Sequence, residues 1–323
     1  MPRKLLPNRW LLMIVILGTT SWILTARGLT AAHPVLIQGN GQLAILAADG
    51  QYEWRMKWGG IHDVHRLPTG NIMVQQGAHK VVEINPATQK VVWSYDASVR
   101  NGNQGVPVEV HSFQPLADGS VMIAESGPAR IIEVDREGKL LRQIKLKVDK
   151  PHSHHDTRLV RKLKSGNYLV CHENDGVVRE YNGAEKVVWE YEVPLFGQPR
   201  KAGHGPEAYG NQLFSALRLD SGNTLIATGN GHRVLEVDPQ GEIVWQVDQK
   251  ELPGITLAWV TTLEVLPNGN YVIGNCHAGP GNPLLIEIEP KSKRVVWTFD
   301  HFDKFGNSAP NSQILGLPTA AVR

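Results

Sequence analysis

The sequence contains little cysteine and has almost no excess of either charge. Two cysteines, Cys171 and Cys276, occur among 323 residues, so a disulfide framework does not hold this fold together. The first 32 residues carry four basic and no acidic residues, which leaves 29 basic against 31 acidic residues in the remainder. Because nucleic-acid recognition usually shows as clustered Lys and Arg, this balance excludes nucleic acid as an expected partner.

The N-terminal segment has the layout of a targeting sequence. A basic stretch, MPRKLLPNR, precedes an uncharged and mostly apolar run from residue 10 to 26, and small residues follow near residue 31. This order is typical of a secretory signal peptide, but the run is also at the short limit for a membrane anchor. Residues 1–32 therefore predict export to the periplasm or the exterior, with membrane contact only through this segment if it stays uncleaved.

A repeated pattern runs through residues 33–323. Each unit has a strand, a turn such as PTGN or DSGN, two more strands, and a closing strand that in most units contains Trp. Four short strands per unit at a spacing near fifty residues are typical of a β-propeller blade. The fold class expected is all-β, a six-bladed propeller with four-stranded blades. The predicted blades are 34–58 plus 312–318, 61–96, 110–148, 157–193, 213–248 and 260–300.

The first of these blades is split between the two ends of the propeller. The segment 34–58 supplies three strands, and SQILGLPTA near the C-terminus supplies the missing innermost strand. Pairing the two closes the ring and removes exposed strand edges. The repeated Trp is interpreted as packing between blades, and the repeated Glu of the third strands as a scaffold feature on a solvated or interblade face.

Histidines gather on one predicted face of the ring. Twelve of the thirteen map to the long connectors, to the loops between second and third strands, or to first strands near the same end, whereas the short turns of the opposite face contain none. Long irregular connections in a compact fold are often functional. The segment PHSHHDTRL, residues 151–159, is the richest example.

The repeat alignment places one residue of each blade at the same level of the central channel. These are His62, His111, Arg158, Phe214, Thr261 and Ser312. Together with His155, the first three are the candidate catalytic residues. The candidate ligand-binding residues are Asp63, His65, Glu109, His154, Asp156, His204, Glu207, Thr261, Thr262, Asn311 and Gln313.

A divalent metal ion is a possible cofactor of this face, although no tight motif such as HExxH occurs. His154, His155, Asp156 and His204 are the candidate ligands, since imidazole and carboxylate groups bind such ions. The dipeptides of Cys171 and Cys276 with the following histidines are interpreted as buried strand residues, and the two thiols lie on non-adjacent blades.

The units EVDPQGEIVWQVD and EINPATQKVVWSYD, with HDVHRLPTGNIMV, resemble the repeats of bacterial arylsulfotransferase-like and pyrroloquinoline-quinone-type propellers. The first resemblance implies sulfate transfer through a channel histidine, with such roles for residues like His62, His111, His155 and Arg158. The alanine-aspartate start of the quinone-type repeat is replaced here by Glu-Val-Asp or Glu-Ile-Asn, so a quinone cofactor is not expected.

Three functions remain open at this point, because a fold does not fix an activity. The first is a recognition module that binds a small molecule, carbohydrate or protein partner in the His-rich funnel. The second is sulfuryl transfer through a channel histidine. The third is a metal-dependent lyase or hydrolase, or a quinone-linked enzyme.

Overall fold

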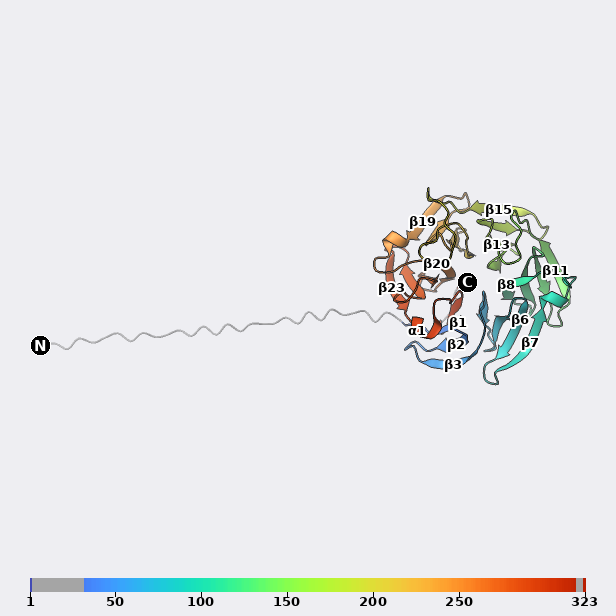
Figure 1. Ribbon diagram of the computed structural model, residues 1–323, viewed down its shortest axis with the longest axis horizontal. Coiled ribbons are helices and arrows are strands. Elements are labelled where there is room, and N and C mark those ends of the chain that lie inside the picture. Colours follow the sequence, from blue (N-terminus) through green and yellow to red (C-terminus); the bar gives the residue numbers. More distant parts are fainter. Residues whose placement is uncertain (2–31, 318–321) are drawn as a thin grey trace. The chain divides into compact units, whose positions relative to one another are not determined.

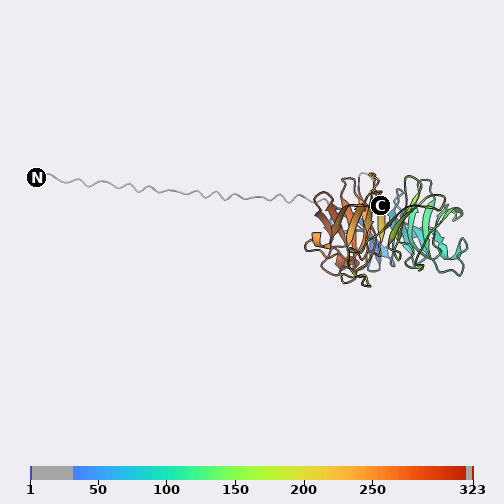
Figure 2. The ribbon, with the colours of Figure 1, turned by 90° about the horizontal axis from the view of Figure 1, so that it is seen from above.

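The computed structural model describes residues 1, 32–317 and 322–323, and these form an all-β propeller of six blades around a central channel (Figures 1 and 2). Each blade is a four-stranded antiparallel sheet, as the sequence predicts. The one α-helix of the described residues is the short α1 (Phe302–Phe305). Two 3₁₀ turns, Ala97–Val99 and Gln249–Glu251, follow the outer strands of their blades.

The strands follow one another around the ring in chain order. The first blade contains β24 (Ser312–Ile314), β1 (Val35–Gly39), β2 (Gln42–Leu46) and β3 (Tyr52–Lys57). The second contains β4 (Val64–Arg66), β5 (Ile72–Gln76), β6 (Lys80–Asn85) and β7 (Lys90–Asp96). The third contains β8 (Glu109–Pro115), β9 (Val121–Ser126), β10 (Arg130–Val134) and β11 (Leu140–Lys145). The fourth contains β12 (Val160–Lys162), β13 (Tyr168–His172), β14 (Val177–Tyr181) and β15 (Val187–Glu192). The fifth contains β16 (Ser215–Arg218), β17 (Thr224–Ala227), β18 (Arg233–Val237) and β19 (Ile243–Asp248). The sixth contains β20 (Trp259–Val265), β21 (Tyr271–Cys276), β22 (Leu285–Glu289) and β23 (Arg294–Phe299).

The ring closes through the strand near the C-terminus, as predicted. β24 pairs antiparallel with β1, with Val35 opposite Ile314 and Ile37 opposite Ser312. Of the segment expected to form this closure, residues 318–320 lie outside the described residues. The predicted targeting segment also lies outside them except at its two ends. Among the described residues, no helix has the length and apolar character needed to cross a membrane.

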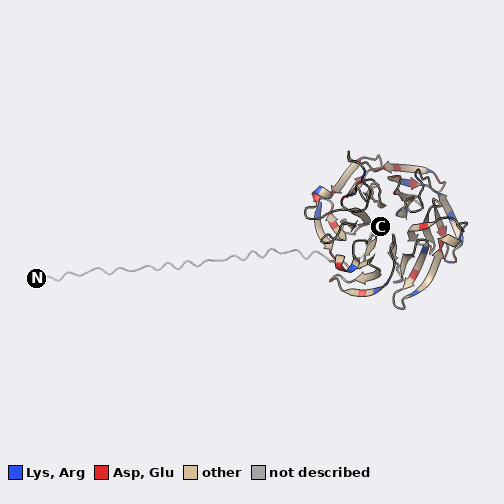
Figure 3. Ribbon diagram, viewed as in Figure 1, with Lys and Arg blue, Asp and Glu red and all other residues tan. Residues whose placement is uncertain are grey.

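The core lies between neighbouring blades. In one cluster, Val81 and Tyr95 of the second blade pack against Val110 and Phe113 of the third, and all four are fully buried. Burying one such side chain stabilises the fold by roughly 1.5–3 kcal/mol. The outer strands instead alternate between part-buried and exposed residues, as in β3. Acidic and basic residues are spread around the ring, on the outer strands among other elements (Figure 3).

The repeated Trp and Glu residues join each blade to the next, as their spacing predicts. The indole of Trp54 donates to the carbonyl oxygen of Pro86 at 3.0 Å. The indole of Trp189 makes the same contact with Pro239, at 3.1 Å. The carboxylate of Glu133 accepts a 2.6 Å hydrogen bond from the Tyr168 hydroxyl of the following blade. The repeated Trp and Glu residues are therefore scaffold elements that connect neighbouring blades.

Candidate functional site

A cavity of about 370 Å³ opens at the His-rich face. Its walls include His62, Glu109, His154, Arg158, Phe214 and Trp259. His204 and His277 complete the aromatic side, where their ring centroids are 5.3 Å apart. Every one of these residues lies on a first strand, on the segment just before it, or in a loop of the same face. The cavity therefore forms where the sequence places its histidines.

Four blades bring their aligned channel residues together at or beside this cavity. The ring centroids of His62 and His111 are 4.4 Å apart, and the ring of Phe214 is 6.5 Å from His62. Arg158 lines the same cavity from the fourth blade. The repeat alignment thus predicted a true neighbourhood for these four residues.

His111 reaches the channel through a β-bulge. Val110 pairs with Glu125 and Ser112 pairs with Ala124, so His111 is the extra residue of β8. Bulges of this kind turn a side chain out of the regular alternation of a strand. A similar irregularity lies between Val260 and Leu263 of β20, at the aligned level of the sixth blade.

His62 is held in one orientation by Gln75. The Gln75 Oε1 atom accepts from the His62 backbone N–H at 2.7 Å and lies 3.3 Å from His62 Nδ1. An amide oxygen only accepts, so Nδ1 carries the ring proton and Nε2 keeps a lone pair. Burial, and then the nearby His111 and Arg158, lower the pKa of His62 well below its ordinary value. His62 is therefore a neutral imidazole at pH 7.

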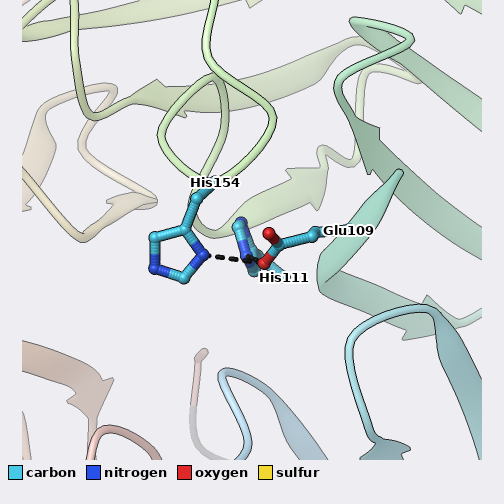
Figure 4. A group of neighbouring side chains, drawn as sticks. All are labelled: Glu109, His111 and His154. Carbon is cyan, nitrogen blue, oxygen red and sulfur yellow. Dashed lines mark hydrogen bonds and ion pairs between the residues drawn. The ribbon is translucent and has the colours of Figure 1, made fainter. Parts of the chain in front are cut away.

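Glu109, His111 and His154 form a compact group beside His62 (Figure 4). Glu109 Oε2 lies 3.1 Å from His111 Nε2 and 2.7 Å from His154 Nδ1. Burial, followed by the charge of Arg158, lowers the pKa of His111 to about 4. The contacts of Glu109 with His111, first, and then with His154 hold its pKa at about 2, against the effect of burial.

Arg158 is buried and is anchored on one side only. Its Nε donates to Glu173, whose other oxygen lies 2.9 Å from His155 Nδ1. Burial would raise the pKa of Glu173, but Arg158 and His155 outweigh it and the pKa is lowered. The Nη1 atom of Arg158 has no hydrogen-bond partner among the described residues, although its side chain is only 4% exposed. His155 thus positions the pair and is absent from the cavity walls.

Three of the predicted ligand-binding residues belong to a separate network away from the cavity walls. Asp63 is fully buried and accepts from Arg161 at 2.8 and 3.1 Å. His65 Nε2 lies 3.4 Å from Asp63 and 2.8 Å from the Phe113 carbonyl oxygen. Burial would raise the pKa of Asp63, but Arg161 and His65 hold it far below its usual range. Asn311 also donates to this carboxylate, at 3.2 Å.

The C-terminal end of the chain lies at the centre of the ring, beside this network (Figure 1). Arg323 donates to the carbonyl oxygens of Val64 and Ser312 at 2.9 and 2.6 Å. Its Nε lies 3.7 Å from Glu264, which accepts from the Ile314 amide. Burial raises the pKa of Glu264 to about 7, against the attraction of Arg323.

The remaining predicted site residues lie outside the cavity walls. Gln313 accepts from the Arg66 amide at 2.6 Å, and Asp156 accepts from the Gly127 amide at 2.9 Å. Thr261 and Thr262 are buried in β20, and Glu207 is exposed. These contacts are those of residues that shape loops and strands.

Three of the four predicted metal ligands have other contacts and do not join a common ligand group in the described part of the chain. His155 contacts Glu173, Asp156 holds the loop backbone, and His204 packs on Trp259 with 4.4 Å between ring centroids. Only His154 joins a group of ligand atoms within the described residues, and its companions are Glu109 and His111.

Several cavity residues were missed from the sequence. Trp259 lies two residues before the aligned position of its blade, and its departure from the repeated Trp position was a signal that could have revealed it. Gln75 and Glu173 act through His62 and Arg158, and His277 lines the wall. No spacing rule connects these residues, because their proximity arises only when the ring closes.

A family model described as outer membrane protein assembly factor BamB matches residues 39–299, which is most of the chain. A search of curated proteins gives no match.

Solved structures show the same fold at low sequence identity. A Bacteroides caccae protein of unknown function is 22% identical, with a TM-score of 0.71 over 90% of this chain and 99% of its own. Virginiamycin B lyase from Staphylococcus aureus, in a catalytically inactive form with quinupristin, is 10% identical, with a TM-score of 0.55 over 86% and 87% of the two chains. A streptogramin B lyase is 11% identical, with a TM-score of 0.54 over 83% of each chain. At these identities the likeness establishes the fold alone.

Proposed function

The chain belongs to the β-propeller family whose model is described as outer membrane protein assembly factor BamB, and on that premise we propose that it is an exported recognition module that binds an anionic ligand in its His-rich funnel. The proposal rests on the cavity of about 370 Å³ and not on the family's partners. A cavity with a few convergent polar groups is the usual form of a small-ligand site.

Arg158 is the observation that carries this proposal. Its guanidinium is buried at the cavity wall, and Glu173 neutralises it on the Nε side only. Its Nη1 is one of several buried side-chain atoms without a partner among the described residues, and Arg158 is the residue of that set that lines the cavity. A planar guanidinium suits a carboxylate, sulfate or phosphate group, and a small rearrangement on binding would give Nη1 an acceptor.

The other walls favour a ligand with an aromatic or planar body. Trp259, Phe214 and the stacked pair of His204 and His277 present ring surfaces to the cavity. Aromatic rings contribute about 0.5–1.5 kcal/mol per pair beyond the area that they bury. The ligand class that fits both features is a small aromatic anion.

Calorimetry with 4-nitrophenyl sulfate tests this binding site. We expect the wild-type protein to bind the probe with one site per chain. The double variant Arg158→Met with Glu173→Gln removes the buried pair together, so neither charge is left alone in the interior. It should fold and lose at least tenfold in affinity, and Trp259→Leu should lose a similar amount through the aromatic wall.

Trp297→Leu is the matched control, because Trp297 lies on the outer strand β23 and is absent from the cavity walls. Its affinity should equal that of the wild-type protein. Equal binding by all three variants, or no binding by the folded wild-type protein to this probe or to benzoate, would reject an anion site in the funnel.

A second candidate function, sulfuryl transfer, is favoured by His62. Its Nε2 lone pair faces no hydrogen-bond partner in the described structure, and Gln75 fixes the ring. In this reaction His62 Nε2 would attack the sulfur of an aryl sulfate, the bond from sulfur to the phenolic oxygen would break, and the phenolate would leave. A phenol would then take the sulfuryl group from His62 and lose its proton to water, which restores the neutral imidazole.

The same probe separates the two functions. Release of 4-nitrophenolate in the presence of phenol, abolished in His62→Ala, would support transfer. Binding without release would leave recognition as the function of the funnel and reject transfer of this group.

Export is a further part of the proposal, and it rests on the layout of residues 1–32. Expression in a Gram-negative host should place the protein in the periplasm, with a new N-terminus near residue 32. Recovery of the intact chain from the cytoplasmic fraction would contradict export.

A further inference from the structure

The group formed by Glu109, His111 and His154 converges on one point beside the cavity (Figure 4). Glu109 Oε2 is close to His111 Nε2 and to His154 Nδ1, and the ligand atoms that the three residues offer all lie within 4.8 Å of one another. Glu109 and His111 come from β8, whereas His154 comes from the connector between β11 and β12. Two separate segments of the chain therefore meet at this point.

The ring of His111 has one proton but two acceptor neighbours, the Thr157 carbonyl oxygen and the Glu109 carboxylate. Its Nδ1 lies 2.9 Å from the Thr157 carbonyl oxygen, which can only accept, so Nδ1 carries the ring proton. In a neutral ring, Nε2 is then a lone pair that faces the Glu109 carboxylate at 3.1 Å. Two acceptors at this distance repel each other unless a cation lies between them.

The three groups meet in a confined place. The side chain of His111 is fully buried, and His62 packs against its ring. A metal ion at this place would use the lone pairs of Glu109, His111 and His154 at once.

We propose that Glu109, His111 and His154 bind one divalent transition-metal ion through these three atoms. Two imidazoles and one carboxylate are a ligand set that suits Zn²⁺ and its neighbours in the first transition row. The Thr157 carbonyl oxygen acts as the outer partner that orients the His111 ring, as such partners do at metal sites.

The geometry needs only a small adjustment to accept the ion. Adjacent ligands at bond lengths of about 2.1 Å lie roughly 3.4 Å apart in a tetrahedral site. The present separations of 2.7 and 3.1 Å from Glu109 Oε2 are shorter by less than an ångström. The His154 side chain is 41% exposed on a long connector, so it can supply this movement.

The metal would leave at least one coordination position open. Glu109 and His154 both line the cavity, so the open position faces the space assigned above to the ligand. The metal proposal stands on these three side chains and does not depend on the proposed anion site.

Metal titration of the full-length protein, stripped by a chelator and free of a histidine tag, tests the site. Calorimetry with Zn²⁺ should give one site per chain. Co²⁺ should give visible absorption bands, which report a site of low coordination number with protein ligands. Glu109→Gln and His154→Ala should each weaken Zn²⁺ binding at least tenfold and reduce the Co²⁺ bands.

His79→Ala is the matched control, because His79 lies on the same face and is partly exposed, but contacts Asp96 instead of this group. It should bind both ions like the wild-type protein. Absence of Zn²⁺ binding, or equal affinity in Glu109→Gln, His154→Ala and the wild-type protein, would overturn the proposal. Both variants keep the buried His111, so we expect them to fold, and circular dichroism checks this before the titration.

Discussion

Asp63 and Arg161 form a buried ion pair that joins the second blade to the fourth across the channel. The two contacts measure 2.8 and 3.1 Å, and the side chains are 98 positions apart in the sequence. The Ser112 hydroxyl of the intervening blade donates to the same carboxylate at 3.1 Å. The carboxylate of Asp63 thus connects three neighbouring blades to one another.

Asp63→Asn should lower the free energy of unfolding by about 3–5 kcal/mol, because it leaves Arg161 charged and unpaired in the interior. Asp220→Asn is the control, since the Asp220 pair with Lys164 is almost fully exposed, and an exposed ion pair contributes little to stability. Urea unfolding measures both. Equal losses in the two variants would show that the buried pair does not brace the ring.

Glu264 should make the protein less stable as the pH rises. Its pKa is raised to about 7, so the folded state retains a proton that the unfolded chain releases near pH 4.5. Stability from this group is therefore complete below about pH 4.5 and is lost as the pH rises through about 7, by an amount on the order of 3 kcal/mol. Glu264→Gln should flatten this dependence in urea unfolding between pH 5 and pH 8. An unchanged slope in the variant would exclude Glu264 as its source.

Gly229→Ala should destabilise the fold far more than Gly279→Ala. Both glycines have positive φ, 55° and 83°, so alanine is strained at either position. At Gly229 a Cβ atom would also lie 1.9 Å from the Gln212 carbonyl oxygen, whereas nothing lies within 4 Å at Gly279. We expect a difference of at least about 2 kcal/mol in the free energy of unfolding. A difference near zero would mean that the contact of Gly229 with the neighbouring backbone relaxes freely.

The two thiols should be unreactive in the folded protein. Burial raises the pKa of Cys276 to about 12, and it raises the pKa of Cys171 as well. Because the thiolate is the reactive form, a thiol reagent at pH 8 should modify neither cysteine in the native state and both in denaturant. Rapid native labelling of Cys276, which borders the cavity, would show that the funnel opens further than this structure does.

The propeller could be predicted almost completely from the sequence, because each blade repeats a local pattern. The turns, the closing Trp54 and Trp189, and the strand completed by residues near 312 all follow from periodicity and from the need to close the ring. Aligning the repeats also brought His62, His111 and Arg158 to one level, and the structure places them together.

The partners of these residues could not be predicted in the same way. Asp63 and His65 are close to His62 in the sequence, but their side chains lie outside the cavity. Asp63 contacts Arg161, and His65 contacts the Phe113 carbonyl oxygen. The direction in which each of these side chains points decides which of them lines the cavity. The bulge that turns His111 toward Glu109 leaves no trace in the repeat alignment. The rings of His154 and His155 in PHSHHDTRL are 4.8 Å apart, yet of the three histidines in this segment only His154 lines the cavity.

A crystal structure of the protein soaked with 4-nitrophenyl sulfate would show directly whether the funnel binds an aromatic anion. We expect density for the sulfate beside Arg158 and His62, with the nitrophenyl ring against Trp259 or Phe214. A funnel that holds only water, while the compound is absent or bound on the opposite face of the ring, would contradict this expectation.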